Sequence, residues 1–112
     1  MFTKLETPIL YTGNIEKAKN FYVEILGFKI ISDSGNFVSL GLGDTKIALN
    51  FADKPNKFPG HQTIILKSDN IEQDHKILKD RGINIELVLT DLGYGRTFIF
   101  RDLDGNKVEV IE

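Results

Sequence analysis

The amino-acid sequence predicts an α+β fold in which two βαβββ units follow one another along the chain. Three matches between the halves, in the same order along the chain, indicate an internal repeat. They are Asn14-Ile15-Glu16 with Asn70-Ile71-Glu72 at an offset of 56, Gly27 with Gly82 at 55, and Lys46 with Lys107 at 61. We therefore expect one domain over residues 1–112, with a first half at 1–56 and a second half at 57–112.

In the first half, alternating apolar residues predict a strand over 5–11. Asn14 is a suitable N-cap for a helix whose apolar residues recur at helical spacing until Gly27. Turn sequences rich in glycine, aspartate and asparagine then separate further strands. These strands are predicted at 28–32, 37–42 and 45–51. Residues 52–60, which include two prolines, are the one linker-like stretch.

The second half repeats this order, beginning with a strand over 61–67. Asn70 and Gln73 form a capping-box-like pair at the start of a helix that Gly82 ends. A glycine-rich loop and an Asp-Leu-Asp-Gly-Asn turn then separate three more strands. These strands are predicted at 83–90, 96–100 and 107–111.

The composition is that of an ordinary soluble globular protein, with 41% hydrophobic and 27% charged residues. A net charge of −2 gives no bulk attraction to nucleic acid or to an anionic membrane. The absence of cysteine excludes disulfides, thiolate metal sites and thiol nucleophiles. No apolar run approaches the roughly 18 residues of a membrane span, and the first residues lack a signal-peptide core. We therefore expect a cytoplasmic protein with no nucleic-acid or membrane partner.

The last predicted strand separates a carboxylate from the apolar core. Lys107, Glu109 and Ile111 alternate there with Val108 and Val110. If the valines face a helix layer, Glu109 projects from the other face of the sheet. It then either lines a pocket or pairs with a cation at the surface.

Two runs carry a resemblance to a known family. They are Phe21-Tyr22 with Leu26-Gly27-Phe28, and Asp102-Leu103-Asp104-Gly105-Asn106 followed by Glu109. With these runs and this order of elements, essentially the whole chain resembles the vicinal oxygen chelate superfamily, although the family usually has proline where Leu103 stands. That superfamily holds glyoxalase I, fosfomycin-resistance thiol transferases, extradiol dioxygenases and bleomycin resistance proteins. The resemblance implies a curved, half-open mixed sheet around a concave pocket, commonly in a homodimer.

The enzymes of this family hold one divalent metal ion on the concave face. The resemblance places Thr7, Ala48, Thr63 and Glu109 at the ligand positions in this chain. A divalent ion requires about three nitrogen or oxygen ligands from the protein, and this set supplies one carboxylate. We therefore expect no metal cofactor, and a divalent metal site is disfavoured.

Two functions of different class follow from the resemblance, so the sequence leaves open whether the protein is an enzyme. One is binding of a small, partly apolar molecule without metal. The other is a metal-dependent lyase, thiol transferase or dioxygenase reaction that uses Glu109 and His61. His61 lies two residues before Thr63, about 6–7 Å along the strand, where it could replace a ligand or act as an acid or base. His75 is expected to be a half-exposed helix residue.

Further residues are candidates for ligand contacts. Arg96 follows the glycine-rich loop and could hold an anionic group, or it is a rim residue. Tyr94 at the loop tip could close over a ligand, and Asn50 shares the face of Ala48. Phe98 belongs to an aromatic strand side for which core packing is the favoured role, and the alternative is that one phenylalanine faces the pocket. The candidate set is therefore Glu109 and His61 as catalytic residues, and Thr7, Ala48, Asn50, Thr63, Tyr94, Arg96 and Phe98 as ligand-binding residues.

Overall fold

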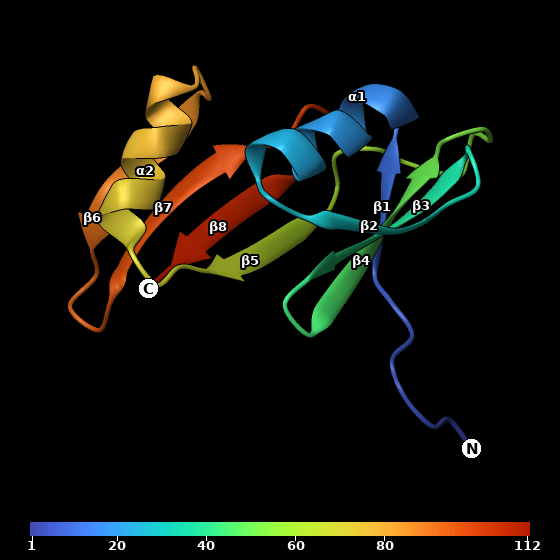
Figure 1. Cartoon of the computed structure of the whole chain (residues 1–112), viewed down its shortest axis with the longest axis horizontal. Coiled ribbons are helices and arrows are strands. Elements are labelled where there is room, and N and C mark those ends of the chain that lie inside the picture. Colours follow the sequence, from blue (N-terminus) through green and yellow to red (C-terminus); the bar gives the residue numbers. More distant parts are fainter. The chain divides into compact units, whose positions relative to one another are not determined.

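The computed structural model describes residues 1–112 as two units, Met1–Gly60 and His61–Glu112, each with its own four-stranded mixed sheet (Figure 1). The elements of the first unit are β1 (Ile9–Thr12), α1 (Ile15–Asn20), the π-helical segment η1 (Phe21–Ile25), β2 (Lys29–Asp33), β3 (Phe37–Leu42) and β4 (Thr45–Phe51). Those of the second unit are β5 (Thr63–Lys67), α2 (Ile71–Asp80), β6 (Ile85–Asp91), β7 (Arg96–Arg101) and β8 (Lys107–Ile111).

The two sheets have the same topology. Their strand orders are β1-β4-β3-β2 and β5-β8-β7-β6. In each sheet the first strand runs parallel to the last, and all other neighbours are antiparallel. This confirms the predicted α+β fold of tandem βαβββ units. The division between the units falls four residues beyond the boundary expected after residue 56.

Both helices begin at the predicted asparagine caps. The Asn14 side chain accepts a hydrogen bond from the Lys17 amide at 3.0 Å, and the Asn70 side chain accepts one from the Gln73 amide at 3.2 Å. A hydroxyl two residues earlier closes each turn, because Thr12 and Ser68 accept from the amides of Asn14 and Asn70, each at 3.1 Å. The matching sequences at the starts of the two helices therefore form the same cap geometry.

The first helix contains one residue more than the second between its cap and its terminal glycine. The extra residue is accommodated in η1, where the Leu26 amide donates to the Phe21 carbonyl, five residues earlier, at 3.2 Å. Both helices then end at a glycine with positive φ, Gly27 at 83° and Gly82 at 80°, where other residues would be strained. The π turn thus explains why the sequence offset falls from 56 to 55 along the helix.

Helices cover one face of each sheet, and we call the opposite face the open face. The large buried apolar residues of the strands lie on the covered faces and alternate with residues of the open face, where the small Ala48 is buried as well. On the covered faces these are Leu10, Val38, Leu40, Ile47 and Leu49 in the first unit and Phe98, Phe100, Val108 and Val110 in the second. No helix of the structure is long and apolar enough to cross a lipid bilayer.

Candidate functional site

Glu109 lies in the middle of β8 on the open face of the second sheet. Its neighbours Val108 and Val110 are buried on the covered face, which confirms the predicted direction of Glu109. The strand pairing places it between Ile65 of β5 and Ile99 of β7. A half-buried carboxylate is therefore flanked by two isoleucines.

Only a weak polar contact reaches this carboxylate from the neighbouring strand. The Thr97 hydroxyl donates to the Val110 carbonyl at 2.8 Å and lies 3.5 Å from Glu109 Oε1. Leu87 of β6 pairs with Ile99 and extends the apolar surface. We call Ile65, Leu87, Thr97, Ile99, Lys107 and Glu109 the Glu109 face. Its apolar side chains are accessible, since Ile65 is 60% exposed and Leu87 is 36% exposed.

His61 does not reach Glu109. β5 begins at Thr63, so His61 precedes the strand, and its side chain is exposed. Thr63 pairs with Lys107, and Ile65 pairs with Glu109. His61 is thus four residues from the partner of Glu109, or about 13 Å along the strand direction. The spacing of His61 from Thr63 is not what separates the two candidates: Thr63 pairs with Lys107 rather than with Glu109, so the two candidate catalytic residues are not brought together.

The candidate residues of the first unit are also not arranged as a ligand site. Thr7 precedes β1, and its hydroxyl donates to the Pro8 carbonyl at 3.1 Å. Ile9, not Thr7, pairs with Ala48, which is fully buried. The Asn50 side chain donates to the Asn36 carbonyl at 3.0 Å and accepts from Lys57 at 3.1 Å. Asn50 therefore connects a turn and a loop of its own unit.

Arg96 and Phe98 lie on the covered face of β7, so Phe98 packs in the core and neither side chain lies on the face of Glu109. Arg96 forms ion pairs with Glu72 of α2 and, at 2.9 Å, with Glu112. Phe98 is fully buried, and its ring lies 5.1 Å from that of the half-buried His75 of α2. Because β7 alternates, Arg96 and Phe98 share one face, and Thr97 and Ile99 share the other. Tyr94 stands at the tip of the β6–β7 turn and is 89% exposed.

Sequence reasoning missed Thr97, Ile65 and Ile99 as neighbours of Glu109. A signal for two of them was present, because Thr97 and Ile99 alternate with Phe98 and Phe100. Assigning both phenylalanines to the core places the threonine and isoleucine beside Glu109. No local signal identifies Ile65, which depends on the pairing of two strands distant in sequence.

The Asp-Leu-Asp-Gly-Asn turn between β7 and β8 is closed by its own hydrogen bonds. Asp102 Oδ1 accepts from the amides of Asp104 and Asn106 at 3.0 and 2.8 Å. Asp102 Oδ2 accepts from the Asn106 side chain at 2.8 Å, and Asn106 Oδ1 accepts from the Gln62 amide at 2.9 Å. We call Asp102, Asn106 and Gln62 the turn lock. It attaches the β7–β8 turn to the chain entering β5, which is a structural role.

The donors present do not fit a divalent metal ion. Glu109 has one carboxylate, and its polar neighbour is the Thr97 hydroxyl, which already donates to a carbonyl. Nowhere in the chain do three histidine, aspartate or glutamate side chains gather as a ligand group. About three such protein ligands are typical of catalytic sites. We derive no metal-dependent step from this arrangement.

The ion pair of Arg96 and Glu112 gives a testable acid sensitivity. A hydrogen bond from the Arg96 side chain, with a second from its amide, lowers the pKa of Glu112 below its ordinary value of 4.5. A lowered carboxyl pKa contributes stability that is present above the unfolded-state pKa and lost as the pH falls through the folded-state value. Wild type should therefore be more stable than Glu112→Gln above pH 4.5, and the difference should vanish in more acidic buffer. Denaturant unfolding over a pH series measures this, with exposed Asp44→Asn as the control; a difference independent of pH would contradict the assignment.

Comparison with known proteins agrees with this architecture. Residues 4–110 match the family model of the Glyoxalase/Bleomycin resistance protein/Dioxygenase superfamily. No curated protein is significantly similar in sequence. An integron cassette protein from the mobile metagenome of V. cholerae is similar over 99% of this chain and 95% of its own, with 26% identity and a TM-score of 0.80.

Two further solved structures share the fold. TnmS3, an antibiotic binding protein from Streptomyces sp. CB03234, is 25% identical over 98% of this chain and 95% of its own, with a TM-score of 0.83. A superfamily member from Sphaerobacter thermophilus DSM 20745 is 23% identical over 99% of this chain and 98% of its own, with a TM-score of 0.79. The repeated βαβββ units and the match over residues 4–110 lead to one conclusion: this chain belongs to the glyoxalase/bleomycin resistance protein/dioxygenase superfamily.

Proposed function

We propose that this protein binds a small, partly apolar molecule on the Glu109 face and does so without a divalent metal. The observation that carries the proposal is the half-buried Glu109 carboxylate between Ile65 and Ile99. A half-buried carboxylate needs a donor or a cation on the side where it is shielded from water, and the Thr97 hydroxyl at 3.5 Å supplies little. A ligand that brings an amine or another hydrogen-bond donor would meet this need.

The apolar residues of the Glu109 face indicate the chemistry of the rest of the ligand. The isoleucines and Leu87 offer apolar contact to a flat or aliphatic body, and burying such surface contributes about 25 cal/mol per Å². The fold neighbour TnmS3 is an antibiotic binding protein by name, which supports small-molecule binding as the kind of function. We infer a ligand with an apolar body and one cationic or donor group.

The test is binding of a cationic aromatic probe to metal-free protein. Proflavine, which is cationic at neutral pH, should bind with the same affinity before and after treatment with a chelator, because no step requires a metal. Elemental analysis after purification without chelator should find zinc, nickel, manganese and iron far below one ion per chain. Stoichiometric metal, or proflavine binding that is lost on chelation and restored by one of these ions, would contradict the proposal.

We further propose that the protein is a homodimer. β1, β2, β5 and β6 are edge strands of their units, and large apolar side chains outside the proposed ligand sites lie exposed on β2 and β6, including Ile30 at 48% and Val88 at 56%. Association of two chains would cover such edges. Analytical ultracentrifugation should give twice the chain mass of 12.6 kDa. A species of the single-chain mass at the highest concentration measured would contradict it.

A further inference from the structure

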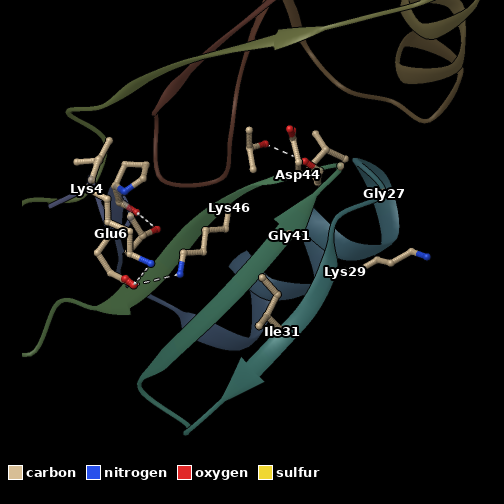
Figure 2. A pocket seen from close by; sticks show the side chains of 14 residues that line it. Lys4, Glu6, Gly27, Lys29, Ile31, Gly41, Asp44 and Lys46 are labelled. Carbon is tan, nitrogen blue, oxygen red and sulfur yellow. Dashed lines mark hydrogen bonds and ion pairs between the residues drawn. The ribbon is translucent and has the colours of Figure 1, made fainter.

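A groove of about 660 Å³ lies in the first unit, between the segment that precedes β1 and the turn joining β3 to β4 (Figure 2). This volume is within the range of about 300–1,000 Å³ typical of small-molecule pockets. Its apolar lining comes from Leu5, Pro8, Ile31 and Leu42. Gly41 adds no side chain, and Ile31 lies directly against it, since a Cβ at Gly41 would be 3.1 Å from Ile31 Cδ1.

Comparison of the two repeats explains why the groove exists. The pairs Gly41–Lys46 and Arg101–Lys107 align the β3–β4 turn with the β7–β8 turn. Leu42 and Thr45 therefore occupy the positions of Asp102 and Asn106, and the first turn is one residue shorter. The side-chain hydrogen bonds of the turn lock have no counterpart in the first unit, where the Thr45 hydroxyl donates to the Leu42 carbonyl at 2.8 Å.

The first unit also has no side chain at the position equivalent to Arg101. In the second unit, the Arg101 guanidinium donates to the Gly105 carbonyl and to Glu86, each at 3.2 Å, and so covers the turn. Gly41 stands at the equivalent position. The sequence of the first repeat therefore lacks both features that close the second turn, and a recess lined by its own residues remains.

One end of the groove carries surplus positive charge. The ammonium groups of Lys4 and Lys46 both lie near the same oxygen of the Glu6 carboxylate, at 3.7 and 3.5 Å (Figure 2). Both distances exceed those of good hydrogen bonds, so each ammonium retains donors for another acceptor. Lys29 and Asp44 also line the groove and add one cation and one carboxylate, which Figure 2 shows away from this end. Two cations thus share one carboxylate beside an apolar wall.

We infer that this groove is a second ligand site, and that it binds a small amphipathic organic anion. The carboxylate or sulfonate of such a ligand would lie at Lys4 and Lys46, and its aromatic or aliphatic body would contact Leu5, Ile31 and Leu42. The charge preference is opposite to that of the Glu109 face, where the protein supplies the carboxylate. The inference therefore does not depend on the function proposed for that face.

The test compares anilinonaphthalene sulfonate with phenylnaphthylamine, which has the same ring system without the sulfonate. Lys46→Gln should weaken sulfonate binding at least about threefold, because it removes one of two cations. Glu6→Gln should strengthen it by about the same factor, because both ammonium groups are then released from their carboxylate. Binding of phenylnaphthylamine should change less than about twofold in either variant. Lys17→Gln on α1, an exposed lysine outside the groove, should change neither probe.

Opposite responses to Lys46→Gln and Glu6→Gln distinguish this site from general hydrophobic adsorption of the dye. The amide signals of Gly41 and Gly43 should shift on titration with the sulfonate probe, which places the probe at the β3–β4 turn. The inference is overturned if wild-type protein does not bind the sulfonate probe, if Glu6→Gln fails to raise its affinity, if Lys46→Gln fails to lower it, or if both probes respond alike. Unshifted Gly41 and Gly43 signals overturn it as well.

Discussion

Replacing Asn106 with alanine is expected to lower the free energy of unfolding by about 2–4 kcal/mol. Asn106 is 1% exposed, and its side chain connects Asp102 with the Gln62 amide. The alanine variant removes the side-chain acceptor of the Gln62 amide and one hydrogen-bond donor to Asp102 at the same time. Unsatisfied buried groups cost more than the hydrogen bonds themselves contribute, because their desolvation is no longer offset.

Chemical denaturation of wild type and Asn106→Ala measures this loss. Asn84→Ala provides the matched control, since Asn84 is exposed before β6 and its replacement should change stability by less than about 0.5 kcal/mol. Asn106→Asp offers a second variant, because it keeps the acceptor for Gln62 but places a carboxylate beside Asp102. It should also be destabilised, and more at neutral than at acidic pH. If Asn106→Ala unfolds like the control, the turn lock does not stabilise the second unit.

Replacing Glu109 with glutamine is expected to weaken proflavine binding at least tenfold, which corresponds to about 1.4 kcal/mol. The substitution keeps the shape of the side chain and removes the charge that the cationic probe would meet. Acridine, which is uncharged at neutral pH, should bind both proteins with similar affinity. The free energy of unfolding should change by less than about 1 kcal/mol, because the carboxylate makes one contact of 3.5 Å within the fold.

Glu72→Gln is the control for this experiment, since it removes a carboxylate from α2, on the covered side of the same unit. It should leave the affinity for proflavine unchanged. Unchanged affinity in Glu109→Gln together with a large loss of stability would mean that Glu109 is structural. The ligand site would then have to lie elsewhere on the protein.

The helices and the repeat could be predicted because their determinants are local in sequence. Asn14 and Asn70 each hold a backbone amide three residues later, and Gly27 and Gly82 adopt the left-handed conformation that ends a helix. Such short-range requirements recur in the same order in both halves, so a repeat in sequence becomes a repeat in structure. Even the change of offset along the helix has a local cause in the π turn of η1.

The site could be predicted only in part, because it depends on strand register. Counting from the helix caps places Thr7 and Thr63 at the ligand positions, but the parallel pairing of β5 with β8 places Ile65 beside Glu109. That register is fixed by the Lys107 amide bonding to the Gln62 carbonyl and by Asn106 holding the Gln62 amide. These contacts join residues more than forty positions apart, and no period along the chain reveals them.

The sequence alone also does not determine which face of β7 packs against the helix. Alternation correctly groups Arg96 with Phe98 and Thr97 with Ile99, but it does not state which pair faces the helix. The ion pair between Arg96 and Glu72 of α2 decides this in the structure. A polar residue that ends a covered strand can reach the helix surface with its charge, which is why Arg96 does not belong to the ligand site.

The most direct measurement of the central claim is a methyl-resolved nuclear magnetic resonance titration of metal-free protein with proflavine in the presence of a chelator. The account predicts that the methyl signals of Ile65 and Ile99, which flank Glu109, shift as the probe binds. The methyl signals of Ile47 and Ile71, which are buried beside the helices, should stay in place. Binding that leaves Ile65 and Ile99 unshifted, or no binding until a divalent metal is added, would contradict a metal-independent site on the Glu109 face.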